Sequence, residues 1–157
     1  MKSTPLYLAT SLARLLVTLW VGGMWAAGYI VAPVLFKTLA PDNILAGNIA
    51  GQIFAVIAWI GLVTASYLLV FIFATKGRAA LREKRFWCVA VMLVCVAVGY
   101  FGIQWEMAAL KAGVGSMDVM ESAARGKFAL LHGLSEAIYL VQSLLGAWLA
   151  ITLNKNL

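Results

Sequence analysis

Long apolar stretches separated by short polar ones divide the chain into four segments. They run over roughly residues 5–36, 44–75, 86–111 and 117–153. Each is long enough to cross the ~30 Å hydrocarbon layer of a bilayer, which takes about 20 helical residues. Small and polar residues recur at alternating spacings of four and three, the period of a left-handed bundle with crossings of about +20°. The pattern predicts an all-α polytopic membrane protein, a left-handed four-helix transmembrane bundle that forms one domain over residues 1–157.

The same spacing predicts which faces of the first two helices pack against the bundle. In the first, the expected stripe is Arg14, Thr18, Gly22, Trp25, Tyr29 and Ala32. In the second, it is Gly47, Gly51, Phe54, Ala58, Gly61 and Ala65. Small residues at this spacing let membrane helices approach closely. Arg14 lies near the starting end, where it is better explained as a headgroup anchor than as a buried charge, and Pro33 should kink the far end.

The last segment has its own start signals. Ser116 can cap a helix whose first turn contains Asp118, and Glu121 lies four residues before Arg125. Opposite charges at that spacing attract each other on a helix surface. We therefore expect a water-exposed helical extension ahead of the membrane-spanning part.

Composition narrows the class of protein. Of the 157 residues, 64% are hydrophobic and only 11% are charged, which excludes an ordinary soluble domain. The formal charge of +6 does not indicate a nucleic-acid partner, because the cations gather between apolar segments and do not alternate with aromatic residues. They cluster in one loop, as Lys76, Arg78, Arg82, Lys84 and Arg85. The lipid bilayer is the expected partner, with a second copy or another membrane protein as a further one.

The cations also predict the orientation of the chain. The two chain ends and the basic loop together carry seven of them, and the opposite side of the membrane carries four. Those four are Lys37, Lys111, Arg125 and Lys127. Because lysine and arginine are enriched on the cytoplasmic side, we expect a multi-pass protein of the bacterial inner membrane with both termini in the cytoplasm.

Motifs of common enzyme classes do not occur in the sequence. It has no CxxC, HExxH, GxxxxGK[ST] or GxSxG pattern, which argues against metalloproteases, P-loop enzymes and serine hydrolases. Cys88 and Cys95 lie about 10 Å apart along a helix axis, too far for a disulfide, so we expect free thiols. With Met92 they form one face that could carry a soft metal such as Cu(I). The alternative is that all three are compact packing residues.

The last segment holds the only histidine, His132, and a glutamate four residues later, Glu136. At ~1.5 Å per residue, Glu136 lies about 12 Å in from Phe128, which predicts a carboxyl group near mid-bilayer. Lipid cannot solvate it, so this face of the helix should look into protein or a wet cavity. The same face also carries Ser135, Tyr139, Gln142, Ser143 and Gly146.

An antiparallel bundle should bring polar residues of the other helices to this pair. The expected ligand-binding set is His132, Glu136, Glu106, Tyr139, Trp25, Tyr29, Gln52 and Gln104. An ionisable residue within a membrane helix is a candidate for function. A structural clasp, in which the Glu136 carboxyl group bonds to histidine or tyrosine and ties helices together, explains the residues equally well.

Three blocks of sequence carry a family resemblance. They are WVGGMWAAGYIVAPVLFKTL from Trp20 to Leu39, AGNIAGQIF from Ala46 to Phe54, and FALLHGLS from Phe128 to Ser135. In this order and spacing they resemble the transmembrane-protein-205-like family, small four-helix membrane proteins of unknown function. The resemblance implies a four-helix membrane domain and no catalytic residues. Its structural motif positions are Gly22, Gly23, Pro33, Gly47, Gly51, Gly133 and Ser135.

Three classes of function fit these residues. The first is a small transporter, carrier or binding protein for a cation, a proton or a soft-metal complex, with His132 and Glu136 as its site. The second is a haem- or metal-linked redox protein with His132 as an axial ligand, which needs a methionine or a second subunit opposite. The third is a non-catalytic accessory or scaffold subunit of a membrane complex. We expect the first class and no enzymatic activity; the sequence names no cofactor.

The orientation is directly testable. Reporter fusions that are active only in the cytoplasm should be active at both termini and in the loop from Lys76 to Arg85. The reason is that seven cations are predicted on that side of the membrane and four on the other. A periplasm-dependent reporter that is active in that loop would reverse the assignment.

Overall fold

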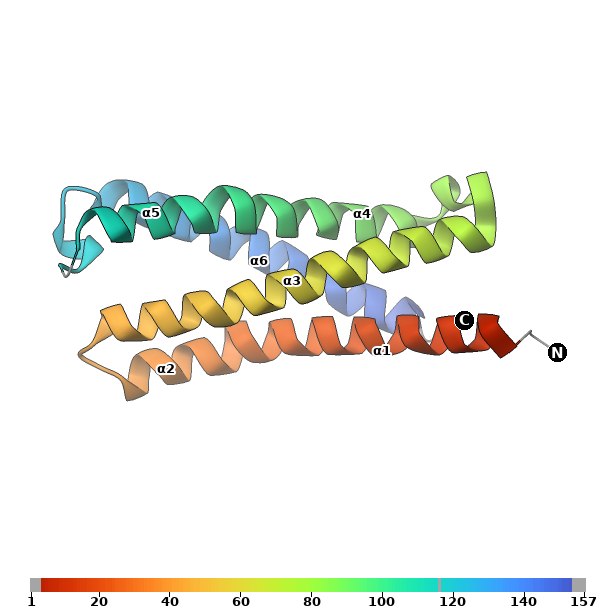
Figure 1. Ribbon diagram of the computed structural model, residues 1–157, viewed down its shortest axis with the longest axis horizontal. Helices are drawn as coiled ribbons and strands as arrows, with labels where there is room; N and C mark the ends of the chain where they lie inside the picture. The colour runs from red at the N-terminus through yellow and green to blue at the C-terminus, as the bar shows by residue number, and fades with distance from the viewer. Residues whose placement is uncertain (1–3, 116, 154–157) are drawn as a thin grey trace.

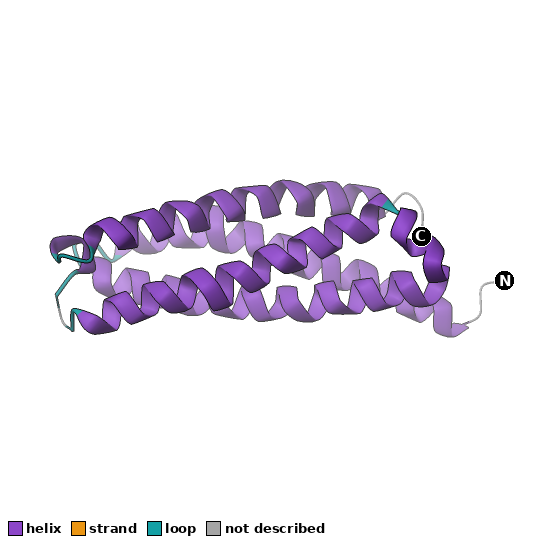
Figure 2. Ribbon diagram, turned by 90° about the horizontal axis from the view of Figure 1, so that it is seen from above, coloured by secondary structure: helices purple, strands orange, loops and turns teal. Residues whose placement is uncertain are grey.

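The computed structural model describes residues 4–115 and 117–153. Within this part of the chain, four helical rods run up and down beside one another, and there is no strand (Figures 1 and 2). The elements are α1 (Thr4–Ala26), the π-helical turn η1 (Ala27–Val31), α2 (Ala32–Thr38), α3 (Asn43–Lys76), the 3₁₀ turn η2 (Gly77–Arg82), α4 (Lys84–Ala97), the π-helical turn η3 (Val98–Gln104), α5 (Trp105–Gly113), the 3₁₀ turn η4 (Val119–Glu121) and α6 (Arg125–Leu153).

The rods have membrane-spanning length and composition. Four stretches qualify as spans: Leu6–Thr38, Asn43–Arg82, Lys84–Gly113 and Arg125–Thr152. Each rod packs against two others, so that α1 lies against α3 and α6, and α4 lies against the same two. The start of α1, the end of α6 and η2 share one end of the bundle (Figure 1). These findings confirm the predicted all-α, multi-pass membrane bundle.

The fourth rod begins later than expected. Residues 117–124 do not extend α6, because the chain forms the η4 turn and then bends before Arg125. The Asp118 carboxylate accepts a hydrogen bond from the Met120 N–H at 2.8 Å, and the Ser122 hydroxyl accepts one from the Ala124 N–H at 3.1 Å. Such short polar side chains compete with helical bonding. The predicted extension with Glu121 is therefore wrong, and the predicted cap Ser116 lies outside the described residues.

Large side chains fill the centre of the bundle where glycines make room. Trp20, Met24, Leu68, Met92 and Leu149 are completely buried. A Cβ atom on Gly61 would lie 2.6 Å from the Trp20 Nε1 atom, so the indole of α1 fits only against a glycine of α3. A Cβ on Gly146 would lie 3.1–3.4 Å from Val21, Met24 and Met92. The interior is thus packed by large residues against small ones, as membrane helices require.

The buried face of α1 differs from the predicted stripe. Thr18, Gly22, Trp25 and Tyr29 are exposed, and Arg14 and Ala32 are half-buried. The face that packs is Thr10, Ala13, Val17, Trp20, Met24 and Ala27. The prediction is wrong for Thr18 and Gly22, because the lipid-facing side of a membrane helix is also apolar, so polarity does not select the packed face. Trp25 and Tyr29 are exposed in part but do contact α6. On α3 the predicted stripe does face the bundle, with Gly61 and Ala65 buried and the rest half-buried.

A π-helical turn precedes Pro33. The Ala32 N–H donates to the Ala27 carbonyl, five residues back, in η1. Proline lacks an N–H and its ring crowds the carbonyl four residues earlier, and a π turn relieves that crowding by adding one residue. The rod therefore continues from η1 into α2, whose second residue is Pro33 (Figure 1).

The contact between Trp20 and Gly61 predicts a matched pair of variants. Gly61→Ala should lower the free energy of unfolding by about 1–3 kcal/mol, because the new methyl group displaces the buried indole. Gly22→Ala, where a Cβ meets no atom within 4 Å, should be neutral or slightly stabilising, since alanine favours a helix by up to about 1 kcal/mol. Reversible unfolding in mixed micelles measures both, and equal losses would contradict this packing.

Candidate functional site

His132 and Glu136 lie on the outside of the bundle, on α6. The His132 Nε2 atom is 3.3 Å from the Glu136 Oε1 atom, and the side chains are 55% and 71% exposed. The buried Phe128 ring stacks on the imidazole with centroids 6.1 Å apart and orients it. The pair therefore does not line an internal cavity of one chain. Within one chain, the expectation that this face of α6 looks into protein is wrong at His132 and Glu136, whereas Gln142, Ser143 and Gly146 of the same face are buried.

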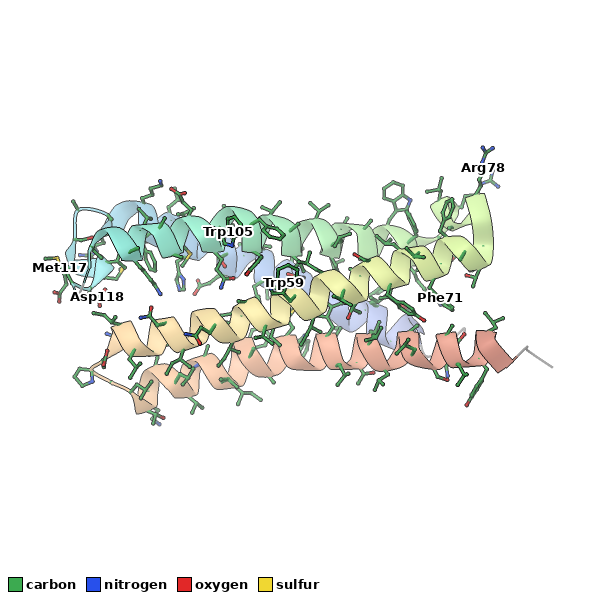
Figure 3. The ribbon with its side chains drawn as sticks, viewed as in Figure 1. Trp59, Phe71, Arg78, Trp105, Met117 and Asp118 are labelled. Atoms are coloured by element: carbon green, nitrogen blue, oxygen red, sulfur yellow. The ribbon has the colours of Figure 1, made fainter. Side chains whose placement is uncertain are left out.

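Two exposed tryptophans lie on the third rod at the spacing expected of the two membrane interfaces. Trp87 and Trp105 are both exposed and lie on the same rod. Their separation of eighteen residues corresponds to ~27 Å, close to the thickness of the layer. Tryptophan and tyrosine concentrate at the two membrane interfaces. Trp59 and Tyr100 gather beside Trp105, with the Trp59 Nε1 donating to the Tyr100 hydroxyl at 3.3 Å (Figure 3).

Contacts across the bundle show which residues lie level with Glu136. Tyr139 packs against Phe54 at 5.4 Å, and the Gln104 side chain donates to the Gly51 carbonyl at 2.7 Å. Glu136 and Gly51 each lie one helical turn from these aromatic partners, toward the same end of the bundle. Glu136 is therefore level with Gln104. The prediction that Glu136 lies near mid-bilayer stays a prediction, since the candidate span Arg125–Thr152 reaches well to either side of it.

The other polar residues of the predicted set do not converge on the pair. Glu106 forms an ion pair with Lys127, and Gln104 is bonded to the Gly51 carbonyl. Gln52 is exposed on α3. Lys111, on α5, donates to the Gly47 carbonyl at 3.3 Å and lies 5.8 Å from the centroid of the Phe128 ring. The outer end of the bundle thus carries several separate polar contacts, not one assembled pocket.

A clasp does tie α1 to α6, but other residues make it. The Tyr29 hydroxyl donates to the Ser143 hydroxyl at 2.9 Å, which donates to the Tyr139 carbonyl at 2.8 Å. The Trp25 Nε1 donates to the Ser143 carbonyl at 3.4 Å. The Tyr139 hydroxyl donates to the Met24 carbonyl. Ser143 is therefore the centre of the clasp.

Glycine permits the closest contact of this clasp. A Cβ on Gly28, in η1, would overlap the Tyr139 ring, so the ring reaches the α1 backbone only because residue 28 has no side chain. Gly28 lies in one of the sequence blocks that carry the family resemblance, whereas Ser143 gave no signal beyond its place on the polar face of α6. The sequence analysis placed Trp25, Tyr29 and Tyr139 in one group, and in the structure they do lie together. It expected them beside His132 and Glu136, whereas their hydrogen bonds go to Ser143 and to the Met24 carbonyl.

The sulfur atoms lie inside the bundle. Cys88 and Met92 are buried, Cys95 is half-buried, and both cysteines are free. The Cys88 Sγ lies 3.6 Å from the Leu145 carbonyl oxygen, to which it donates. Among the described residues, no three His, Cys, Asp or Glu side chains are placed to hold a metal ion together. The soft-metal hypothesis for Cys88, Met92 and Cys95 thus stays a prediction.

Two hollows lie at the opposite end of the bundle from His132. One, of about 40 Å³, lies between α1 and α3 and reaches Lys76, Glu83 and Arg85. The other, of about 360 Å³, is a shallow surface hollow lined by Leu69, Val70, Phe73, Ala74 and Phe86. Neither is lined by any residue of the predicted ligand-binding set.

Comparison with known proteins gives one match. A family model described as "Domain of unknown function (DUF4149)" matches residues 15–115, more than half of the chain. The matched region ends before α6, so His132 and Glu136 lie outside it. No curated protein and no solved structure matches the chain.

The position of the clasp can be tested by comparing two conservative variants. Tyr139→Phe should lower the free energy of unfolding by about 0.5–1.5 kcal/mol, because it removes the hydrogen bond to the Met24 carbonyl. Glu136→Gln should change it by less than about 0.5 kcal/mol, because that side chain is exposed. Unfolding in mixed micelles measures both, and the reverse order would place the clasp at His132 and Glu136.

Proposed function

Since the chain belongs to the DUF4149 family, a domain of unknown function, we propose from its geometry that it is a membrane carrier or binding protein for a proton or small cation. The binding groups are His132 and Glu136. We further propose that the chain lies in a bacterial inner membrane with both termini in the cytoplasm, and that it is a relative of the transmembrane-protein-205-like family.

One observation carries this proposal. An imidazole nitrogen and a carboxylate oxygen lie 3.3 Å apart on one helix face and are open to ligands from outside the bundle. Neutral histidine and carboxylate are ligands that Zn²⁺ and similar divalent ions accept. The Phe128 ring lies parallel to the imidazole, with the ring centroids 6.1 Å apart.

The packed interior favours a surface site over a path through one chain. Trp20, Met24, Leu68, Met92 and Leu149 fill the centre of the bundle. A cation that crosses would therefore need a route between chains or a rearranged bundle. Because one chain offers two ligands and a tetrahedral site needs four, water, a second copy or another membrane protein would supply the rest.

Cation binding can be measured on the full-length protein in detergent, with Zn²⁺ as the probe. Zn²⁺ should raise the free energy of unfolding by about 2.7 kcal/mol at one hundred times its dissociation constant. His132→Ala and Glu136→Gln should each abolish this stabilisation.

A matched control uses another exposed carboxylate at this end of the bundle, Glu106. Glu106→Gln removes an acid that already pairs with Lys127, so Zn²⁺ stabilisation should be retained. Absence of any Zn²⁺ effect in the parent, or an equal loss in all three variants, would refute a site at His132 and Glu136.

A further inference from the structure

The turn between α3 and α4 gathers five cations around one acid. Residues 76–85 contain Lys76, Arg78, Arg82, Lys84 and Arg85, with Glu83 as the only carboxylate. Lys76 pairs with Glu83 at 2.5 Å. This hydrogen bond and the charge of Lys76 lower the pKa of Glu83, which keeps the carboxylate ionised and the pair neutral. Among the described residues, no carboxylate pairs with Arg78, Arg82 or Lys84.

The backbone holds these cations in a fixed arrangement. Gly77 turns the chain with a φ of 56°, and η2 crosses the end of the bundle (Figure 1). Ala80 is fully buried and fixes the inner face of η2. The Trp87 Nε1 donates to the Leu81 carbonyl at 2.9 Å, which ties η2 to α4. The Arg78 side chain points away from the bundle (Figure 3). A preformed array of cations loses less entropy when it binds an anion.

The cations come just before an exposed tryptophan, Trp87, near the start of α4. Because tryptophan concentrates at membrane interfaces, we infer that Trp87 lies at the inner boundary of the hydrocarbon layer and that the residues before it lie among the lipid headgroups. Leu81 and Trp87 are exposed apolar side chains beside the cations. The guanidinium groups of Arg78 and Arg82 match phosphate oxygens in geometry as well as in charge.

An apolar hollow lies directly below the basic turn. Leu69, Val70, Phe73, Ala74 and Phe86 line this space of about 360 Å³ on the outer surface of α3 and α4. Phe73 and Ala74 come just before Lys76 in the chain, and Phe86 directly follows Arg85. The hollow therefore continues the basic turn toward the membrane centre, where an acyl chain would lie.

We propose that this surface is a binding site for one anionic phospholipid, whose phosphate contacts Arg78, Arg82 and Lys84 and whose acyl chain lies in the hollow. The two chemistries occur together only in a lipid, because a free phosphate or a nucleic acid has no alkyl chain for the hollow. A zwitterionic lipid carries its own cation and gains less from the array. The site is independent of His132 and Glu136.

Lipid binding is tested on the purified full-length protein in a non-ionic detergent. Native mass spectrometry would compare phosphatidylglycerol with phosphatidylcholine of the same chain length. The parent should bind phosphatidylglycerol at least about tenfold more tightly, and the triple variant Arg78→Gln, Arg82→Gln, Lys84→Gln should lose this preference. The matched control Lys37→Gln, Arg125→Gln removes exposed cations at the other end of the bundle and should keep it.

A second variant tests the hollow. Ala74→Trp fills it from an exposed position, so it should weaken the binding of both lipids while the preference for the anionic headgroup remains. Equal affinity of the parent for both lipids, or an unchanged preference in the triple variant, would overturn the proposal. Displacement of the lipid by millimolar inorganic phosphate would show an anion site without a lipid chain and would overturn it too.

Discussion

Hydrocarbon offers no hydrogen bonds, and this constraint shapes every level of the structure. Backbone groups within the layer must bond within their own helix, which leaves four rods as the form of the chain. Several hydroxyl groups in the spans follow the same rule, although the buried Thr64 hydroxyl has no hydrogen-bond partner among the described residues. Thr18, Thr75 and Thr152 each donate to a carbonyl one turn earlier, as Ser143 does in the clasp.

The same constraint separates the residues that pack the helices together from the ionisable residues. Without a hydrophobic drive between helices, association depends on close fit, and large residues of one rod occupy spaces left by glycines of another. Trp20 against Gly61 and Tyr139 against Gly28 are the tightest examples. A centre filled in this way leaves no room for a ligand, so ionisable groups appear on the outside.

The two ends of the bundle present different chemistry to the membrane surfaces. At one end, η2 carries an array of cations above an apolar hollow. At the other, acids, cations and one histidine form short pairs, Glu106 with Lys127 and His132 with Glu136. The proposed lipid and cation sites follow this division.

The sequence by itself determined the number of rods, their length and where most of them end, because twenty-residue apolar runs and polar turns have one stable solution in a bilayer. It also located the clasp aromatics Trp25, Tyr29 and Tyr139. Tertiary structure alone decided which face of α1 is buried, because both lipid and protein interior accept apolar side chains. It also decided which residues lie level with Glu136, since contacts such as that of Tyr139 with Phe54 fix the register of α6 against α3. The late start of α6 depended on side-chain bonds of Asp118 and Ser122, which local spacing does not reveal.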